Sequence, residues 1–131
     1  MRILLNNAEQ RLAKYLANQR FTQNRNNGIK NSKIGDQSDE QTDLEGIGAE
    51  IAFCKMTNVY PDTQIGERLN EDAVLHSGET IDVKATKYRN GHLLVARWKQ
   101  VGVSHYALMV GEFPAYRFAG YIRSDQIMRP D

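Results

Sequence analysis

The chain has 131 residues, a length that suits one domain with a single hydrophobic core and leaves no room for a second. Hydrophobic residues make up 40% of the sequence and charged residues 25%, as in ordinary soluble domains, so the composition excludes a fibrous or wholly disordered chain. The net charge of +1 gives no general argument for an anionic partner.

The only cysteine, Cys54, cannot form an internal disulfide, and no Cys/His spacing matches a structural zinc site. No apolar run is long enough to span a bilayer, and the N-terminus lacks the hydrophobic centre of a secretory signal. We therefore expect a soluble protein of a reducing, cytoplasmic compartment.

Charge is unevenly distributed in the first half of the chain. A mostly basic segment, residues 11–33, precedes an acidic segment, residues 36–50. The basic residues are Arg11, Lys14, Arg20, Arg25, Lys30 and Lys33. Such an arrangement could hold a polyanion near a metal ion, or it could equally consist of two solvated segments of opposite sign.

The pattern predicts a helix over residues 8–20, with Asn7 as its cap and a modest apolar stripe that includes Leu12 and Leu16. Residues 22–43 are rich in Asn, Gln, Gly and Ser and nearly free of apolar side chains. Because such a segment cannot bury enough surface to fold by itself, we interpret residues 22–43 as a mobile polar loop that can order on a ligand.

A second helix is predicted over residues 43–57, with Asp43 as its cap. Its apolar stripe consists of Leu44, Ile47, Ile51 and Cys54. Cys54 is therefore interpreted as a buried small side chain rather than a nucleophile.

Two glutamates of this helix are predicted to differ in their exposure to solvent. Glu50 lies at the border of the apolar stripe, so its carboxylate should point toward the edge of the core, where a cation could compensate its burial. Taken alone, Glu50 is also compatible with an ordinary surface position. Glu45 falls on the far side of the helix and is expected to be solvated.

Beyond an irregular connection at residues 63–71, the hydrophobic period becomes that of strands. The five predicted strands are residues 72–76, 80–86, 92–97, 105–110 and 116–123, with a tight turn at Asn90-Gly91 and a short helical turn from Ser124 to Met128. Helices followed by about five strands predict a fold of the α/β (α+β) class.

The strand TIDVKAT, Thr80 to Thr86, carries the most informative pattern. Since successive side chains of a strand point to opposite faces, Ile81, Val83 and Ala85 form an apolar row, and Asp82 and Lys84 share the other face. A surface ion pair between Asp82 and Lys84 would stabilise little.

The register of the preceding hairpin decides whether Asp72 joins this pair. A three-residue loop, Ser77-Gly78-Glu79, sets Val74 opposite Asp82 and Asp72 opposite Lys84. Ala73 and Leu75 then extend the apolar row, and Gly78 can take a left-handed conformation. The two aspartates and the lysine are predicted to converge, and aspartates on opposite faces of the sheet would remove Asp72 from the site.

Carboxylates placed together repel one another unless a proton or a cation bridges them, and oxygen ligands favour Mg²⁺ or Mn²⁺. Such an ion can activate water and stabilise the charge that grows on a phosphate, and a nearby lysine can assist. Asp72 and Asp82, with the main-chain carbonyl of Val83, have the chemistry for this site.

These residues resemble the signature of the PD-(D/E)XK nuclease superfamily, the restriction-endonuclease-like fold. Asp72 matches its first acid, Asp82-Val83-Lys84 matches the (D/E)XK element, and Glu50 matches the acid that many members carry on a preceding helix. The stretches GIGAEIAFCKMTNVYPD, GETIDVKATKYRNGHL and GEFPAYRFAGYI look like small nuclease-like proteins common in bacteriophages. Glu71 stands where the signature often has proline, and it is a competing ligand.

The resemblance covers roughly residues 43–125 and implies a central mixed sheet of about five strands flanked by helices. It also implies a magnesium-dependent deoxyribonuclease, an endonuclease or exonuclease, of a bacterial or phage-infected cell. Glu50, Asp72, Asp82 and Lys84 would be catalytic, and Glu50, Asp72, Asp82 and the Val83 carbonyl would hold the metal. A chain this short that cuts both strands would act as a homodimer.

Three further residues are candidates for substrate binding. Lys87 and Arg89 follow the motif and could contact phosphate or remain solvated. Gln100 lies where many family members carry a polar residue that positions water or substrate. Four aromatic residues are interpreted as core or subunit-contact residues rather than base-stacking platforms, namely Tyr88, Trp98, Tyr106 and Tyr121. The three histidines are interpreted as structural or surface residues, namely His76, His92 and His105.

Two alternatives to a DNA nuclease remain open. One is a non-catalytic nucleic-acid-binding or assembly protein that keeps the same fold. The other is a metal-dependent hydrolase of small phosphoesters, because the sequence does not reveal the size of the cleft.

Overall fold

The computed structural model describes residues 2–26, 39–64, 72–87 and 104–123. Within them lie two helices, α1 (Asn7–Asn26) and α2 (Asp39–Thr57), and five strands. The strands are β1 (Arg2–Leu4), β2 (Ala73–Val74), β3 (Thr80–Thr86), β4 (His105–Glu112) and β5 (Ala115–Arg123). They form one sheet in the order β1-β5-β4-β3-β2, in which β3 and β4 are parallel and all other neighbours are antiparallel. The predicted mixed α+β class is confirmed.

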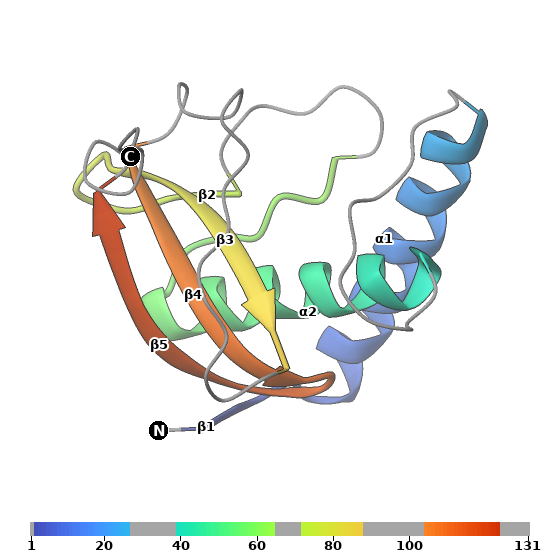
Figure 1. Cartoon of the computed structure of the whole chain (residues 1–131), viewed down its shortest axis with the longest axis horizontal. Helices are drawn as coiled ribbons and strands as arrows, with labels where there is room; N and C mark the ends of the chain where they lie inside the picture. Colours follow the sequence, from blue (N-terminus) through green and yellow to red (C-terminus); the bar gives the residue numbers. More distant parts are fainter. Residues whose placement is uncertain (1, 27–38, 65–71, 88–103, 124–131) are drawn as a thin grey trace, which may run out of the picture.

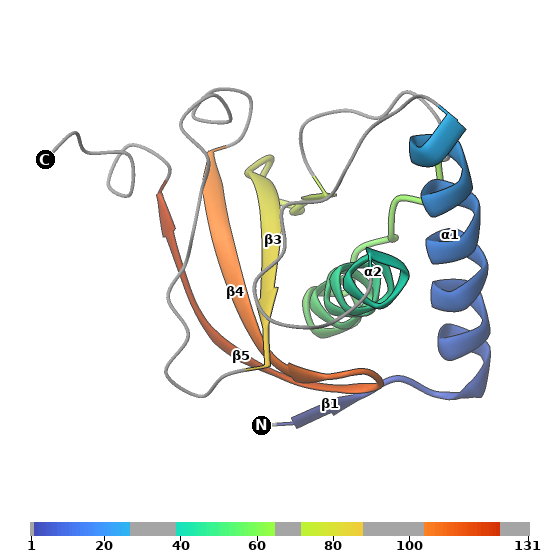
Figure 2. The ribbon, with the colours of Figure 1, turned by 45° about the vertical axis from the view of Figure 1, so that its right-hand side comes forward.

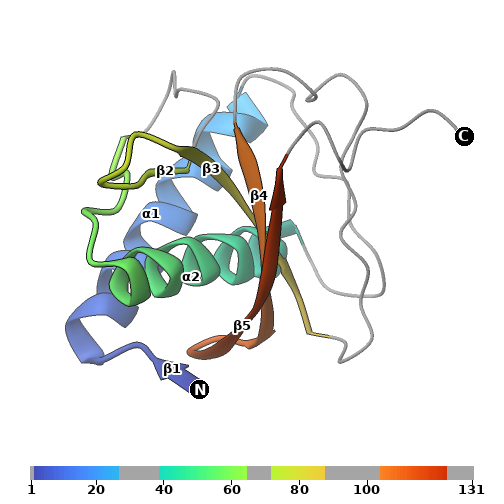
Figure 3. The same ribbon diagram turned by 90° about the vertical axis from the view of Figure 1, so that its left-hand side faces the viewer.

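Both described helices lie on the same side of the sheet (Figures 1 and 2). Helix α2 packs across the sheet, and α1 covers the outer side of α2 (Figure 2). The sheet curls so that β1 and the turn between β4 and β5 reach beneath α2 (Figure 3). This order of layers buries α2 between the sheet and α1.

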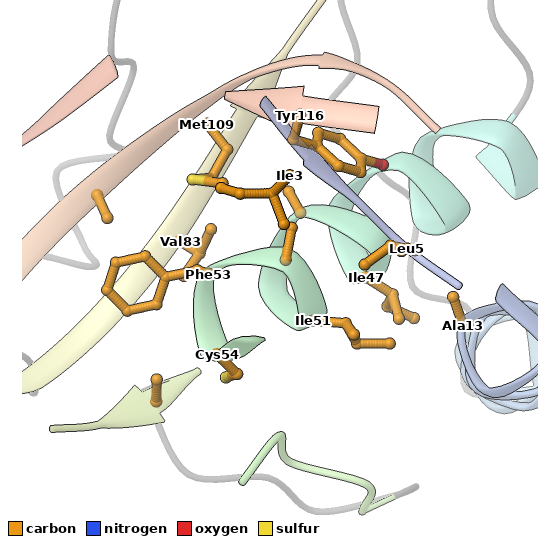
Figure 4. Close-up of a cluster of buried hydrophobic side chains, with 14 of the residues drawn as sticks. Ile3, Leu5, Ala13, Ile47, Ile51, Phe53, Cys54, Val83, Met109 and Tyr116 are labelled. Atoms are coloured by element: carbon orange, nitrogen blue, oxygen red, sulfur yellow. The ribbon is translucent and has the colours of Figure 1, made fainter. Parts of the chain in front are cut away.

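The core is built around α2, which is hydrophobic on nearly all sides from Ile47 to Cys54 (Figure 4). A helix of this kind needs partners on both sides. Ile81 and Val83 of β3 and Met109 of β4 are among the side chains that cover it from the sheet, all less than 7% exposed. Cys54 is buried in this core, as predicted.

Helix α1 begins with a capping box at Asn6. The Asn6 side chain accepts a hydrogen bond from the Glu9 backbone N–H, and Glu9 accepts one from the Asn6 N–H. The cap is therefore Asn6, one residue before the predicted Asn7. The buried residues of α1 recur at helical spacing, whereas Tyr15 is exposed; they are Ala13, Leu16, Ala17 and Arg20.

The predicted loop of residues 22–43 is wrong at both ends. Residues 22–26 continue α1, and residues 39–43 form the first turn of α2, so Asp43 is inside the helix and is not its cap. The first turn of α2 is polar, and an apolar stripe cannot reveal a turn that has none. Residues 27–38 lie outside the described residues.

Strand predictions held best along the middle of the sheet. β3 has the predicted bounds, whereas the strand expected over residues 72–76 is reduced to Ala73–Val74, and β4 and β5 are one or two residues longer than predicted. Strand β1 was not predicted. The apolar row of β3 ends at Val83 because Ala85 is exposed. The strand at residues 92–97, the Asn90-Gly91 turn and the helical turn after Ser124 lie outside the described residues.

Glu45 joins α2 to the turn between β4 and β5, which corrects its predicted solvation. Its Oε1 accepts a hydrogen bond of 2.7 Å from the Phe113 N–H and lies 3.0 Å from the Tyr116 hydroxyl. Gly48 permits this close approach, because a Cβ there would collide with the Tyr116 hydroxyl and lie 2.7 Å from the Phe113 ring. Burial, together with the charge and hydrogen bond of Glu45, raises the pKa of Tyr116.

In the described part of the chain, no helix combines the length and the hydropathy that crossing a membrane requires.

Candidate functional site

The β2–β3 hairpin has a different register from the predicted one. Ala73 pairs with Ile81 and Val74 with Thr80, and Leu75 N–H donates to Glu79 O, so the three-residue loop is residues 76–78. Gly78, with φ of 95°, has the left-handed conformation expected of it. The shift moves each partner by two residues, which leaves every side chain on its predicted face.

The new register brings Asp72 to Asp82 instead of Lys84. The two carboxyl groups share a hydrogen bond, and Asp72 Oδ2 also accepts one of 2.8 Å from the Val83 N–H. A third hydrogen bond, of 2.7 Å from Asp72 N–H to Ile81 O, fixes the backbone. The aspartates are therefore adjacent, as the convergence of the polar residues predicted.

Lys84 lies beside this pair. Its Nζ is 3.1 Å from Asp82 Oδ2, and its side chain is 25% exposed, so the ammonium group reaches both the acids and solvent. Tyr106, the neighbour of Asp82 in the parallel register, is fully buried, and its pKa is raised by burial and by the charge of Asp82. The interpretation of Tyr106 as a core residue is confirmed.

Glu50 approaches the pair from α2 and is held by Arg20. The Glu50 carboxylate, 15% exposed, lies 3.7 Å from Arg20 Nη1. The buried Arg20 side chain also donates to the backbone carbonyls of Gln64 (3.0 Å) and Asp62 (2.9 Å). Arg20 therefore fixes a site carboxylate and the chain after α2 at the same time.

The sequence interpretation did not single out Arg20. A signal was present, since Arg20 follows Ala13, Leu16 and Ala17 at the spacing of one helix face. An arginine at a buried position of a stripe requires partners, and these come from distant segments.

The pKa of Asp72 reflects the burial and the charges of the site. Burial, the charge of Glu50, and the hydrogen bond and charge of Asp82 raise the pKa of Asp72 well above its usual value, and the Val83 N–H opposes them only in part. Burial and the charges of Glu50, Asp72 and Asp62 likewise raise the pKa of Cys54 to about 12. The Cys54 thiol is thus uncharged at neutral pH, in agreement with its interpretation as a core side chain.

The predicted metal ligands are only partly brought together in the structure. Among the described residues, no group of three or more Asp, Glu, His or Cys side chains is arranged to hold an ion jointly. Asp72 and Asp82 are adjacent, whereas Glu50 comes from the helix layer. Because the N–H and C=O of a strand residue point toward the same neighbour, the Val83 carbonyl is directed to the edge where Asp72 lies.

The other predicted residues lie apart from this group or outside the description. Lys87 is exposed just after β3, while Arg89, Gln100, Glu71, Tyr88, Trp98 and His92 fall outside the described residues. His76 contacts Asn58 O, and His105 lies 3.4 Å from Glu79 Oε2. Exposed Tyr121 packs against the His105 and Phe118 rings. Both histidines thus have structural contacts, as interpreted.

Comparison of the chain with protein-family models, with curated proteins and with solved structures finds no match.

Proposed function

We propose that this protein is a metal-dependent nuclease that hydrolyses phosphodiester bonds of DNA on a restriction-endonuclease-like fold. The observation that carries the proposal is the hydrogen-bonded contact of Asp72 with Asp82, with Lys84 Nζ 3.1 Å from Asp82 Oδ2. Two buried acids brought together cost stability unless a proton or cation neutralises them. A cation-dependent reaction explains why the chain keeps this arrangement.

The oxygen donors of this pair are of the type that a hard cation, Mg²⁺ or Mn²⁺, prefers. Asp72, Asp82 and the Val83 carbonyl are the groups that we assign to it, and Glu50 is the further acid. When bound, such an ion would lower the pKa of the attacking water and neutralise charge on the phosphate.

The chain's own residues hold this geometry. The Val83 N–H fixes Asp72 Oδ2, and Arg20 forms an ion pair with Glu50. Lys84, paired with Asp82, can orient the water and stabilise the negative charge that develops on the phosphate. The parallel pairing of β3 with β4 keeps Asp82 and Lys84 on a rigid element.

The test is cleavage of plasmid and single-stranded DNA with Mg²⁺. We expect Asp82→Asn and Lys84→Ala each to lower the cleavage rate about 100-fold or more, because each removes charge stabilisation from the reacting phosphate. Glu40→Gln and Arg117→Ala change an exposed acid and an exposed base and should cut like the wild type.

Two outcomes would refute the proposal. Cleavage that persists in Asp82→Asn and Lys84→Ala would assign it to another site or to a contaminant. No cleavage by the wild type, with DNA binding unchanged in both variants, would favour the non-catalytic nucleic-acid-binding protein instead.

A further inference from the structure

A pocket opens beside Asp72, between the chain that follows α2 and the start of β2. It is lined by residues 60–64 and 72–74 and has a volume of about 310 Å³, which is within the range of small-ligand pockets. Its two walls are residues 60–64 and residues 72–74. Arg20 anchors the first wall by donating to the carbonyls of Asp62 and Gln64.

The residues that line the pocket favour a ligand with a flat, uncharged ring. Tyr60, which is 83% exposed, presents an aromatic side chain at the pocket, and Val74, 50% exposed, adds an apolar group. Neither lysine nor arginine is among the described lining residues, whereas Asp62 and Asp72 are, so a phosphate is disfavoured there. Carboxylates and the Thr63 hydroxyl can instead accept hydrogen bonds from ring amino groups.

We infer that this pocket receives one unpaired nucleotide base next to the phosphodiester that is cut, with the base stacked on Tyr60. The inference rests on the proposed function, because Asp72, which borders the pocket, belongs to the proposed metal site. A base inside a duplex is stacked and paired, and turning it into a side pocket costs free energy that an unpaired base does not lose. The protein should therefore select single-stranded, flapped or frayed DNA.

Sequence preference should be weak. Every base has a π face, so stacking on a tyrosine tolerates all four. The contribution of Asp62 should appear only as a modest preference for bases that carry an exocyclic amino group.

The first test is binding, measured by fluorescence anisotropy with labelled single-stranded and duplex oligonucleotides in Mg²⁺, in the Lys84→Ala background to prevent cleavage. Tyr60→Ala should weaken binding of the single strand about tenfold, and Tyr60→Phe, which keeps the ring, should stay within about twofold. Binding of the duplex should not change. Tyr15→Ala removes another exposed tyrosine, on α1, and should have no effect.

Equal single-strand affinity of the Tyr60→Ala and Tyr60→Phe variants would overturn the inference, as would a loss that is the same for duplex and single strand. An abasic nucleotide at successive positions of the oligonucleotide sharpens the test. One position should weaken binding when Tyr60 is present and have little further effect in Tyr60→Ala, since the two changes remove the same contact.

Cleavage by proteins with Lys84 intact separates this inference from the proposed function. A wild type that binds single strands through Tyr60 and cuts no DNA would support the base pocket and refute the nuclease. A wild type that cuts DNA, with a single-strand-to-duplex rate ratio unchanged by Tyr60→Ala, would refute the base pocket and support the nuclease.

Discussion

Glu45 and Glu50 lie on the same helix, little more than one turn apart, yet their carboxylates have opposite surroundings. Glu45 is surrounded by donors, the Phe113 N–H and the Tyr116 hydroxyl, which join α2 to the turn between β4 and β5. Glu50 has Arg20 on one side and adds its charge to the Asp72–Asp82 pair on the other. The first carboxylate stabilises the fold, whereas the second increases a repulsion.

The difference shows how a structural acid is distinguished from a candidate functional one. Burial does not separate them, because both glutamates are half-buried. What separates them is that hydrogen-bond donors surround Glu45, whereas Glu50, besides its pairing with Arg20, is close enough to Asp72 for its charge to raise the pKa of that group. Changes at Glu45 and at Glu50 should therefore affect different measurements.

The largest effect is expected from Arg20→Ala, which breaks the link between Glu50 and residues 62–64. It leaves a half-buried carboxylate and two carbonyls without this partner, so the free energy of unfolding should fall by about 3–5 kcal/mol. Urea unfolding followed by circular dichroism measures it. Arg11→Ala, an exposed arginine of α1, should change the same quantity by less than about 0.5 kcal/mol. Equal stability of the two variants would mean that the buried contacts of Arg20 contribute nothing.

Glu45→Gln and Glu50→Gln form a matched pair that tests the comparison directly. Glu45→Gln weakens bonds to a charged acceptor and should lower the free energy of unfolding by about 1.5–3 kcal/mol, with cleavage unchanged where the protein is folded. Glu50→Gln should lower Mg²⁺-dependent cleavage about 10- to 100-fold and cost less stability, because it also relieves repulsion at Asp72. The reverse pattern, with activity lost at Glu45 and kept at Glu50, would contradict the assignment of the two roles.

The sequence predicted the local elements of this site better than the long-range contacts that hold the site in place. The alternation in Thr80–Thr86 is unambiguous, so the bounds of β3 and the shared face of Asp82 and Lys84 were correct. The hairpin register was shifted by two residues. Both loops place the same residues on each face, so the hydrophobic pattern cannot distinguish them.

The side chains that hold the site in place bind residues that are distant in the sequence. The Arg20 side chain finds its backbone acceptors 42 and 44 residues away, and the donors to Glu45 Oε1 lie 68 and 71 residues away. Sequence periodicity contains no information about such partners. Strand β1 has only three residues, too few for a period to be recognised.

The smallest effect should appear in the pH dependence of stability of the metal-free protein. Burial and the neighbouring carboxylates raise the pKa of Asp72, whereas in the unfolded chain this group titrates near its ordinary value of about 3.9. Between the two values the native state holds a proton that the unfolded state has lost. The stability from Asp72 is thus complete below about pH 4 and is lost as the pH rises through the raised pKa, by at most about 1.4 kcal/mol per pH unit.

Asp72→Asn should remove this contribution, because asparagine does not titrate but still offers an oxygen to the Val83 N–H. Urea unfolding in EDTA between about pH 4 and pH 8 should therefore show wild-type stability falling relative to Asp72→Asn, and Glu45→Gln should keep the wild-type slope. Mg²⁺ can replace the proton as the neutralising charge, so it should raise the stability of the wild type at neutral pH and leave Asp72→Asn unchanged. Parallel pH curves for the wild type and Asp72→Asn would show that the surroundings of Glu45 do not differ in charge balance from those of Glu50 and Asp72, and the basis for assigning a cation beside Asp72 would be lost.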